Sequence, residues 1–178
     1  GNIRYYGSDP NNYIYFNCSD YDNQSSDTCE LWRIIGVFDY EVKLIKNDSI
    51  GNYEWDNESN NWNTSTLKDM LNSGTYYDTL TEQTKDLLYQ NTWYLGYDKT
   101  TKDPYKYTPS DMYNAERSSV VHTGNPKIWQ GYIGLMYPSD YMYSADFNSC
   151  NKTLQGYNDY DSDKLCTSNN WIFNYTES

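Results

Sequence analysis

Hydrophobic and polar positions in the first third of the chain form short segments that predict three strands. Residues 31–38, LWRIIGVF, are the most apolar run and are rich in β-branched side chains, which is typical of a central strand. Residues 41–47, EVKLIKN, alternate apolar with charged side chains, and a tight turn at 39–40 makes them the expected hairpin partner. Residues 13–16, YIYF, predict another short strand that leads into a polar loop.

Two of the following segments have the spacing of amphipathic helices. Residues 63–74 place Leu and Met side chains on one face, with Thr64 or Ser65 available as the N-cap and a glycine at the end. Residues 81–90 predict a second helix, because the Thr-x-x-Glu segment at 79–82 fits a capping box and leucines follow it.

The second half of the chain has weaker signals. Residues 92–97 and 131–137 predict strands, and Pro138 is expected to end the second of them. The long polar segment between them is expected to hold a short strand within 114–124. After Ala145 the pattern predicts loop to the end of the chain.

Length and composition favour one folded domain. The chain has 178 residues, which suits a single domain. A mean hydropathy of −0.97 is typical of disorder, but 22 Tyr and 6 Trp are not, because disordered chains are poor in aromatic residues. We therefore expect residues 1–178 to form a single α+β domain with small antiparallel sheets and two short helices. Because the sequence begins and ends abruptly, we expect it to be an excised or processed piece of a longer protein.

The charge of the chain limits its partners. A net charge of −12 argues against nucleic acid and against an anionic membrane surface, since both need clustered Lys and Arg. No run of 18 apolar residues is present, so we expect no membrane span in this piece. Cations, neutral glycans and basic proteins remain compatible partners.

Four cysteines bracket two polar, turn-rich loops. Four cysteines allow three pairings. Pairing Cys18 with Cys29 and Cys150 with Cys166 would close each polar loop, and closing a loop of about 15 residues stabilises the fold by about 3 kcal/mol. We therefore expect these two disulfides. Such disulfides predict an oxidising, extracellular location. The alternative is a zinc site, but no CxxC spacing is present and His122 is the only histidine.

Several segments resemble a family of uncharacterised surface proteins of Gram-positive gut bacteria. The segments are LWRIIGVF at 31–38, TWYLGY at 92–97 and GLMYPSDYMYSA at 134–145. Members of that family often follow a helix like that of type IV pilins, so the resemblance implies a pilin-like, cell-surface protein. The W-x-x-S-x-L-x-x-x-L-N segment at 62–72 is also similar to C-type-lectin-like domains, which include the formylglycine-generating enzymes. Relatives continue with a further strand, so the resemblance implies that a fold of this type is C-terminally incomplete here.

Aromatic side chains are the candidate binding residues, because rigid rings with a polar tip suit contacts with sugars and proteins. Those in or beside predicted loops are expected to be exposed: Tyr105, Tyr107, Tyr113, Trp129, Tyr141 and Tyr143. Tyr141 and Tyr143 alternate and could share one face. The alternative is that most of the aromatic side chains fill the core, which we expect for Trp32, Trp93, Tyr132 and Tyr137 in the predicted strands.

Candidate catalytic and metal-binding residues are few. His122 stands alone without a nucleophile, and Glu116 beside Arg117 suggests a structural ion pair. No pair of carboxylates stands out for glycoside hydrolysis. The alternating Asp159, Asp161 and Asp163 resemble the first half of a calcium loop, although Lys164 stands where an EF-hand needs glycine. The alternative is a solvated acidic loop.

The sequence therefore predicts a non-catalytic extracellular domain that acts in adhesion or assembly through aromatic and hydrogen-bonding contacts. Its partners would be other copies of itself, or a surface protein or glycan, and no cofactor other than calcium is suggested. The alternative is a carbohydrate-active or formylglycine-type enzyme domain on the cell surface. That alternative would need a pocket in which titratable groups with perturbed pKa values converge.

Overall fold

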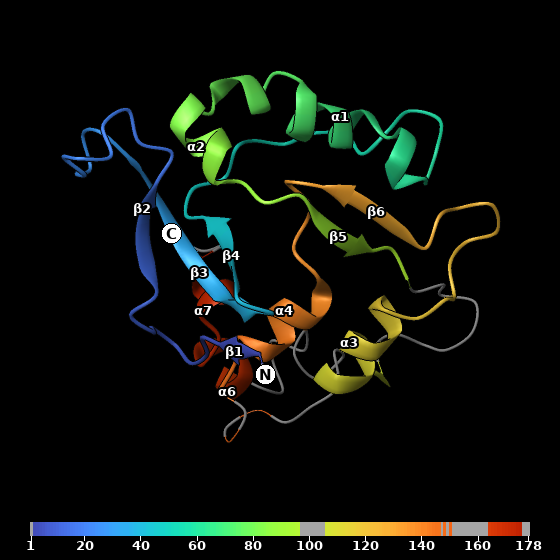
Figure 1. The fold of residues 1–178 in the computed structure, drawn as a ribbon. Helices are drawn as coiled ribbons and strands as arrows, with labels where there is room; N and C mark the ends of the chain where they lie inside the picture. The colour runs from blue at the N-terminus through green and yellow to red at the C-terminus, as the bar shows by residue number, and fades with distance from the viewer. Residues whose placement is uncertain (1, 97–105, 147, 149, 151–163, 176–178) are drawn as a thin grey trace.

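A long central strand organises the main sheet of the protein (Figure 1). In the computed structural model, β3 (Glu30–Phe38) pairs antiparallel with three strands. β4 (Glu41–Lys46) follows through a turn at 39–40, where both residues have positive φ, as a tight hairpin turn requires. β1 (Ile3–Arg4) and β2 (Tyr13–Phe16) pair with the end and the start of β3. The structure describes residues 2–96, 106–146, 148, 150 and 164–175.

A second, smaller sheet is formed by β5 (Asn91–Tyr94) and β6 (Ile128–Gly131). The two strands are antiparallel, with Trp93 opposite Trp129. The strands predicted in the first third of the chain are confirmed. β5 confirms the first part of the strand predicted over 92–97. The strand predicted over 131–137 is wrong, because the pairing of β6 ends where that prediction begins.

Asn72 explains why the chain leaves the sheet after β6. Its Oδ1 accepts hydrogen bonds from the backbone N–H groups of Tyr132 at 3.1 Å and Ile133 at 3.0 Å, and its Nδ2 donates to the Ile133 carbonyl at 2.8 Å. The backbone here is therefore bonded to a side chain of α1 (Thr66–Ser73) and not to a neighbouring strand.

The first predicted helix is confirmed by α1. It begins at the N-cap Ser65, whose Oγ accepts from the Lys68 N–H at 3.2 Å, and it ends before Gly74. A 3₁₀ turn, η1 (Trp62–Thr64), leads into it and places a tryptophan next to its start.

The second predicted helix is present but shorter and differently capped. α2 (Glu82–Leu87) has Thr81 as its N-cap, which accepts from the Thr84 N–H at 3.2 Å. The predicted capping box at Thr79 is wrong, because that residue lies in the 3₁₀ turn η2 (Tyr77–Thr79) and its hydroxyl donates to a backbone carbonyl.

Two helices that the sequence pattern did not predict begin in the same way. α3 (Pro109–Glu116) and α4 (Pro138–Tyr143) each start with proline, and Asp111 or Asp140 accepts the backbone N–H of the residue before that proline. The short strand expected within 114–124 and the strand end expected at the second proline are therefore wrong. Proline has no N–H to lose at the first helical position, so it favours a helix start there.

The end of the described chain is helical and not the predicted loop. α6 (Lys164–Ser168) and α7 (Trp171–Tyr175) lie on the opposite side of the sheets from α1 and α2 (Figure 1). Trp171 is 1% exposed, packs against Ile35, and donates from Nε1 to the Tyr5 carbonyl at 3.0 Å. Burial of this indole therefore joins the C-terminal helix to the chain beside β1.

Both predicted disulfides are confirmed. Cys18 pairs with Cys29, and Cys150 pairs with Cys166. The second disulfide belongs to a core cluster whose other buried members are Tyr107, Met112, Met142 and Ala145. Within the described ranges, no helix is both long and apolar enough to cross a membrane. The fold is thus the predicted single α+β domain of small antiparallel sheets and short helices, with more helices than expected.

Candidate functional site

Four tryptophans gather around an open pocket of about 130 Å³. Trp93 comes from β5, Trp129 from β6, Trp62 from η1, and Trp55 from the loop before it. We call this site the tryptophan pocket. Its other lining residues are Tyr94, Leu95, Gly134, Leu135, Met136 and Tyr137.

The indoles of the tryptophan pocket form a continuous chain of ring contacts. Ring centroids lie 5.3 Å apart for Trp55 and Trp62, 5.5 Å for Trp62 and Trp129, and 6.3 Å for Trp129 and Trp93. These separations fall in the range where aromatic pairs contribute about 0.5–1.5 kcal/mol beyond area burial. Trp62 is 6% exposed and Trp55 is 39% exposed, so the indole of Trp62 is covered and that of Trp55 is accessible to solvent.

Local sequence holds Trp93 and Trp55 in these positions. The Trp93 Nε1 donates to the Gly131 carbonyl at 2.9 Å, and a Cβ at Gly134 would lie 2.7 Å from the Trp93 ring. A side chain at that glycine would therefore displace the indole. Asp56 holds the loop of Trp55, because its carboxylate accepts from three backbone N–H groups, including that of Thr66 at 3.1 Å.

Tyr137 forms one wall of the tryptophan pocket and touches a second site. Its hydroxyl donates to the Tyr94 carbonyl at 3.0 Å and accepts from the Tyr94 N–H at 2.7 Å. Its ring centroid lies 4.5 Å from Lys43 Nζ and 5.2 Å from the Arg117 guanidinium carbon. Burial raises the pKa of Tyr137 to about 12, although the hydrogen bond with Tyr94 and the nearby Arg117 act against it.

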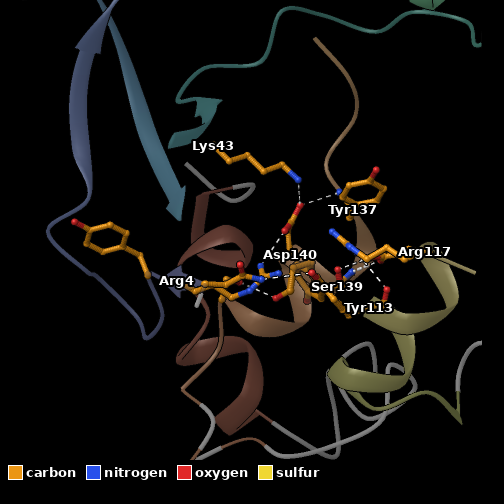
Figure 2. Close-up of polar contacts among 12 residues, drawn as sticks. Arg4, Lys43, Tyr113, Arg117, Tyr137, Ser139 and Asp140 are labelled. Carbon is orange, nitrogen blue, oxygen red and sulfur yellow. Dashed lines mark hydrogen bonds and ion pairs between the residues drawn. The ribbon is translucent and has the colours of Figure 1, made fainter. Parts of the chain in front are cut away.

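The second site is a group of buried charges around Asp140, shown in Figure 2. The Asp140 side chain is 2% exposed, and Arg4 and Lys43 converge on its carboxylate, with Arg4 Nη1 at 2.9 Å. The backbone N–H of Tyr137 also donates to it at 3.2 Å. Burial by itself would raise the pKa of Asp140, but the two cations outweigh it and hold the pKa below its ordinary value. We call Arg4, Lys43, Asp140, Glu116 and Arg117 the charge cluster.

Glu116 is the other buried carboxylate of the charge cluster. It accepts from Ser139 twice, from the backbone N–H at 2.7 Å and from Oγ at 2.5 Å, and from Arg117 Nη1 at 3.1 Å. Burial raises the pKa of Glu116, and the bonds from Ser139 and the charge of Arg117 only partly offset this. The predicted structural ion pair of Glu116 with Arg117 is confirmed.

The two carboxylates differ in pKa, as the acid and base of an enzyme would, but their positions are those of structural groups. Neither Asp140 nor Glu116 lines the tryptophan pocket, and their oxygens are already bonded to protein donors. All four cysteines are in disulfides. Across the described residues, no group of three or more His, Cys, Asp and Glu side chains could hold a metal ion.

The aromatic side chains predicted to bind do not form one exposed patch. Trp129 lies in the tryptophan pocket. Tyr107 is only 7% exposed, so its predicted exposure is wrong, because it packs into the core beside the second disulfide. Tyr113 lies under the guanidinium of Arg117 at 3.5 Å. Tyr105 and the candidate calcium ligands lie outside the described residues: Asp159, Asp161 and Asp163.

The tyrosines around Pro138 differ from the prediction. Tyr132 is 37% exposed and not in the core, because the chain has left the sheet before it. Tyr141 and Tyr143 are half-buried and do not share a face, since they lie in the helix α4 and not in an extended segment. Tyr141 packs against both core clusters, and the Tyr143 ring centroid lies 4.6 Å from the Arg4 guanidinium carbon.

Three members of the tryptophan pocket were missed by sequence reasoning: Trp55, Trp62 and Trp93. Trp55 and Trp62 lie in the same polar segment, 48–63, but Trp93 lies far from them along the chain, so no local pattern joins all three. The available signal was compositional, because large apolar rings in a polar segment such as 48–63 must either pack together or remain exposed.

Comparison with known proteins adds no identification. No family model matches the chain, and neither a curated protein nor a solved structure matches it. The resemblance to a bacterial surface-protein family and to C-type-lectin-like domains therefore stays a prediction.

Proposed function

We propose that this protein is an extracellular, non-catalytic domain of a cell-surface or pilin-like protein, and that it binds a partner through the tryptophan pocket. The observation that carries the proposal is the gathering of four indoles around one open pocket. Concave sites lined by aromatic side chains are typical ligand-binding sites. The proposed role is adhesion or assembly.

The exposure of the pocket rim supports a binding role. Trp55 is 39% exposed, Tyr94 39% and Leu135 45%, and all three line the pocket. Aromatic rings that serve only the core would be covered, whereas a contiguous open group of them is a feature of interaction sites. Trp62 also has a buried Nε1 that has no hydrogen-bond partner among the described residues. Buried donors of this kind are rare in folded proteins and call for an explanation.

The charge cluster supports a non-catalytic role. A general acid or base needs access to a substrate, and a nucleophile needs an activating base. Asp140 and Glu116 are almost fully buried and are engaged by Arg4, Lys43 and Ser139. We infer that they support Tyr137 and the start of α4 and do not act on a substrate.

The two disulfides support the extracellular location, because such bonds persist in oxidising compartments. The proposed partners are a second copy of the chain, a surface protein or a surface glycan. In each case the partner would place a group of limited size into the tryptophan pocket, with the remaining contacts made by the surface around it.

Replacement of Trp55 by alanine tests this proposal. We expect Trp55→Ala to weaken binding about tenfold or more, measured both as self-association by sedimentation and as binding to immobilised glycans and surface proteins. Tyr53→Ala is the matched control, because Tyr53 lies in the same loop, is 54% exposed and does not line the tryptophan pocket. Unchanged binding by Trp55→Ala to a partner that the wild type binds would contradict the proposal.

A further inference from the structure

We propose that the tryptophan pocket, taken as the binding site under the proposed function on which this inference rests, holds a fully methylated ammonium group such as that of choline. Ring faces attract cations, and Trp does so more strongly than Tyr or Phe. Four indoles and two phenol rings line this one pocket. The chemical class of the partner would then be one that carries an organic cation.

The lining of the pocket favours a cation without N–H groups. None of the side chains that line it carries a carboxylate, amide or amine group. The hydroxyl of Tyr137 is already bonded to the backbone of Tyr94. A primary ammonium needs hydrogen-bond acceptors in place of water, and such a lining does not supply them. A fully methylated ammonium donates no hydrogen bond, so it loses none on entry.

The size of the pocket agrees with a compact group. Its volume is about 130 Å³, and an apolar protein cavity of about 150 Å³ takes up a molecule the size of benzene. One trimethylammonium group fits such a space, whereas a pair of linked sugars does not. In the part of the chain that the structure describes, no cation lies over the rings of Trp55, Trp62 or Trp129.

The loop that carries Trp55 is acidic. Trp55 lies between Glu54 and Asp56, and Glu58 follows, with Glu54 and Glu58 exposed. Backbone N–H groups, foremost that of Glu58, lower the pKa of Asp56 below 3.8, so this carboxylate is charged at neutral pH. Together with the net charge of −12, these carboxylates attract a cation toward the open side of the pocket.

Two protein cations next to the pocket wall are already neutralised. Lys43 and Arg117 contact the ring of Tyr137, and they form ion pairs with Asp140 and Glu116. Lys43 Nζ also lies 5.5 Å from the ring centroid of Trp93, and the Arg117 guanidinium carbon lies 5.5 Å from that of Tyr94. Neither cation lines the pocket. The rings of Trp55, Trp62 and Trp129, over which no described cation lies, and the acidic loop are therefore the groups that attract a cationic ligand.

A titration with choline chloride tests the inference. Tryptophan fluorescence and calorimetry would compare choline with its neutral isostere, in which a carbon replaces the nitrogen, at constant ionic strength. We expect saturable binding of choline that is about tenfold or more tighter than that of the isostere. Trp55→Phe should weaken choline binding less than Trp55→Ala does, and Tyr53→Ala should leave it unchanged.

The possible outcomes separate this inference from the proposed function. Equal binding of choline and the isostere would overturn the cation preference and leave an apolar binding pocket. Absence of saturable choline binding would also overturn it, while loss of partner binding in Trp55→Ala would still support the proposed function. If Trp55→Ala binds both choline and the partner as the wild type does, both proposals are overturned.

Discussion

Tyr137 separates two regions of opposite character, the tryptophan pocket and the charge cluster. On the cluster side, Asp140 is 2% exposed and bonded to two cations. On the pocket side, the last indole in the chain of ring contacts is that of Trp55, which is 39% exposed. The buried charges are satisfied by their neighbours, whereas none of the described residues covers the rings at the open side of the pocket.

In an acidic, aromatic chain, buried charges and accessible apolar rings differ in how strongly they point to function. Buried ionisable groups with shifted pKa values are often sought as active sites, but those of the charge cluster are explained by structural pairing. Structural pairing does not explain the accessible rings at the rim of the tryptophan pocket. We therefore expect mutations in the charge cluster to change stability and mutations at the open rim of the pocket to change binding.

The largest effect is expected at the centre of the charge cluster. Asp140→Asn removes the negative charge and leaves Arg4 and Lys43 buried without their partner, which should cost about 3–5 kcal/mol of unfolding free energy. Urea unfolding measures this change. Asp86→Asn is the control, because Asp86 is exposed on α2 and its replacement should change stability by no more than about 0.5 kcal/mol. Equal effects of the two variants would contradict a structural role for the cluster.

The pH dependence of Asp140→Asn sharpens the same point. Since the cations hold the pKa of Asp140 below 3.8, its carboxylate contributes stability above that pH and loses it as the pH falls through the lowered pKa. The difference in unfolding free energy between wild type and variant should stay constant from neutral pH down to pH 3.8 and shrink below it. A difference that already disappears well above pH 3.8 would show that the pKa is not lowered.

A smaller effect is expected where the backbone supports the pocket. Gly134→Ala places a Cβ at 2.7 Å from the Trp93 ring, so the ring must move. Overpacking of this kind costs about 1–3 kcal/mol. The unfolding free energy and the near-ultraviolet circular dichroism of the tryptophans should both change. An unchanged tryptophan spectrum would show that this glycine does not position the indole.

Among the variants of the pocket and the charge cluster described so far, the smallest change in stability is expected for Tyr137→Phe, which keeps the ring between the two regions. Loss of the hydroxyl should cost about 1 kcal/mol, because it bonds to the backbone of Tyr94. Burial raises the pKa of Tyr137 from 10.0 to about 12, so its contribution is complete below pH 10.0 and is lost as the pH rises through about 12. The variant should therefore lose less stability across this alkaline range, as measured by urea unfolding at a series of pH values. An identical alkaline loss in both proteins would contradict the raised pKa.

Much of the fold follows from local sequence signals. The hairpin of 31–38 with 41–47 has the expected alternation, and both disulfides close the polar loops that suggested them. The starts of α3 and α4 were also readable, since TPSD at 108–111 and YPSD at 137–140 both place proline and aspartate at capping positions. These short segments are less conspicuous than the long polar stretch before α3 and the apolar run before α4.

The rest depends on contacts between distant segments. The run 131–137 has the composition of a strand, but Asn72 binds its first amides and turns it away from the sheet. The tryptophan pocket joins four segments, so no spacing in the sequence could predict it. Of the predicted binding residues, Trp129 lies at that pocket, because β6 pairs it with Trp93.

The most direct test of the account is one paired measurement on Trp55→Ala. Its unfolding free energy and its binding to the partner, or to choline, would be measured in the same samples beside wild type and Tyr53→Ala. We predict a fall in affinity of about tenfold or more with a stability loss of no more than about 1 kcal/mol, because Trp55 is already 39% exposed. Wild-type affinity in a folded Trp55→Ala protein would contradict the claim that the tryptophan pocket is the binding site.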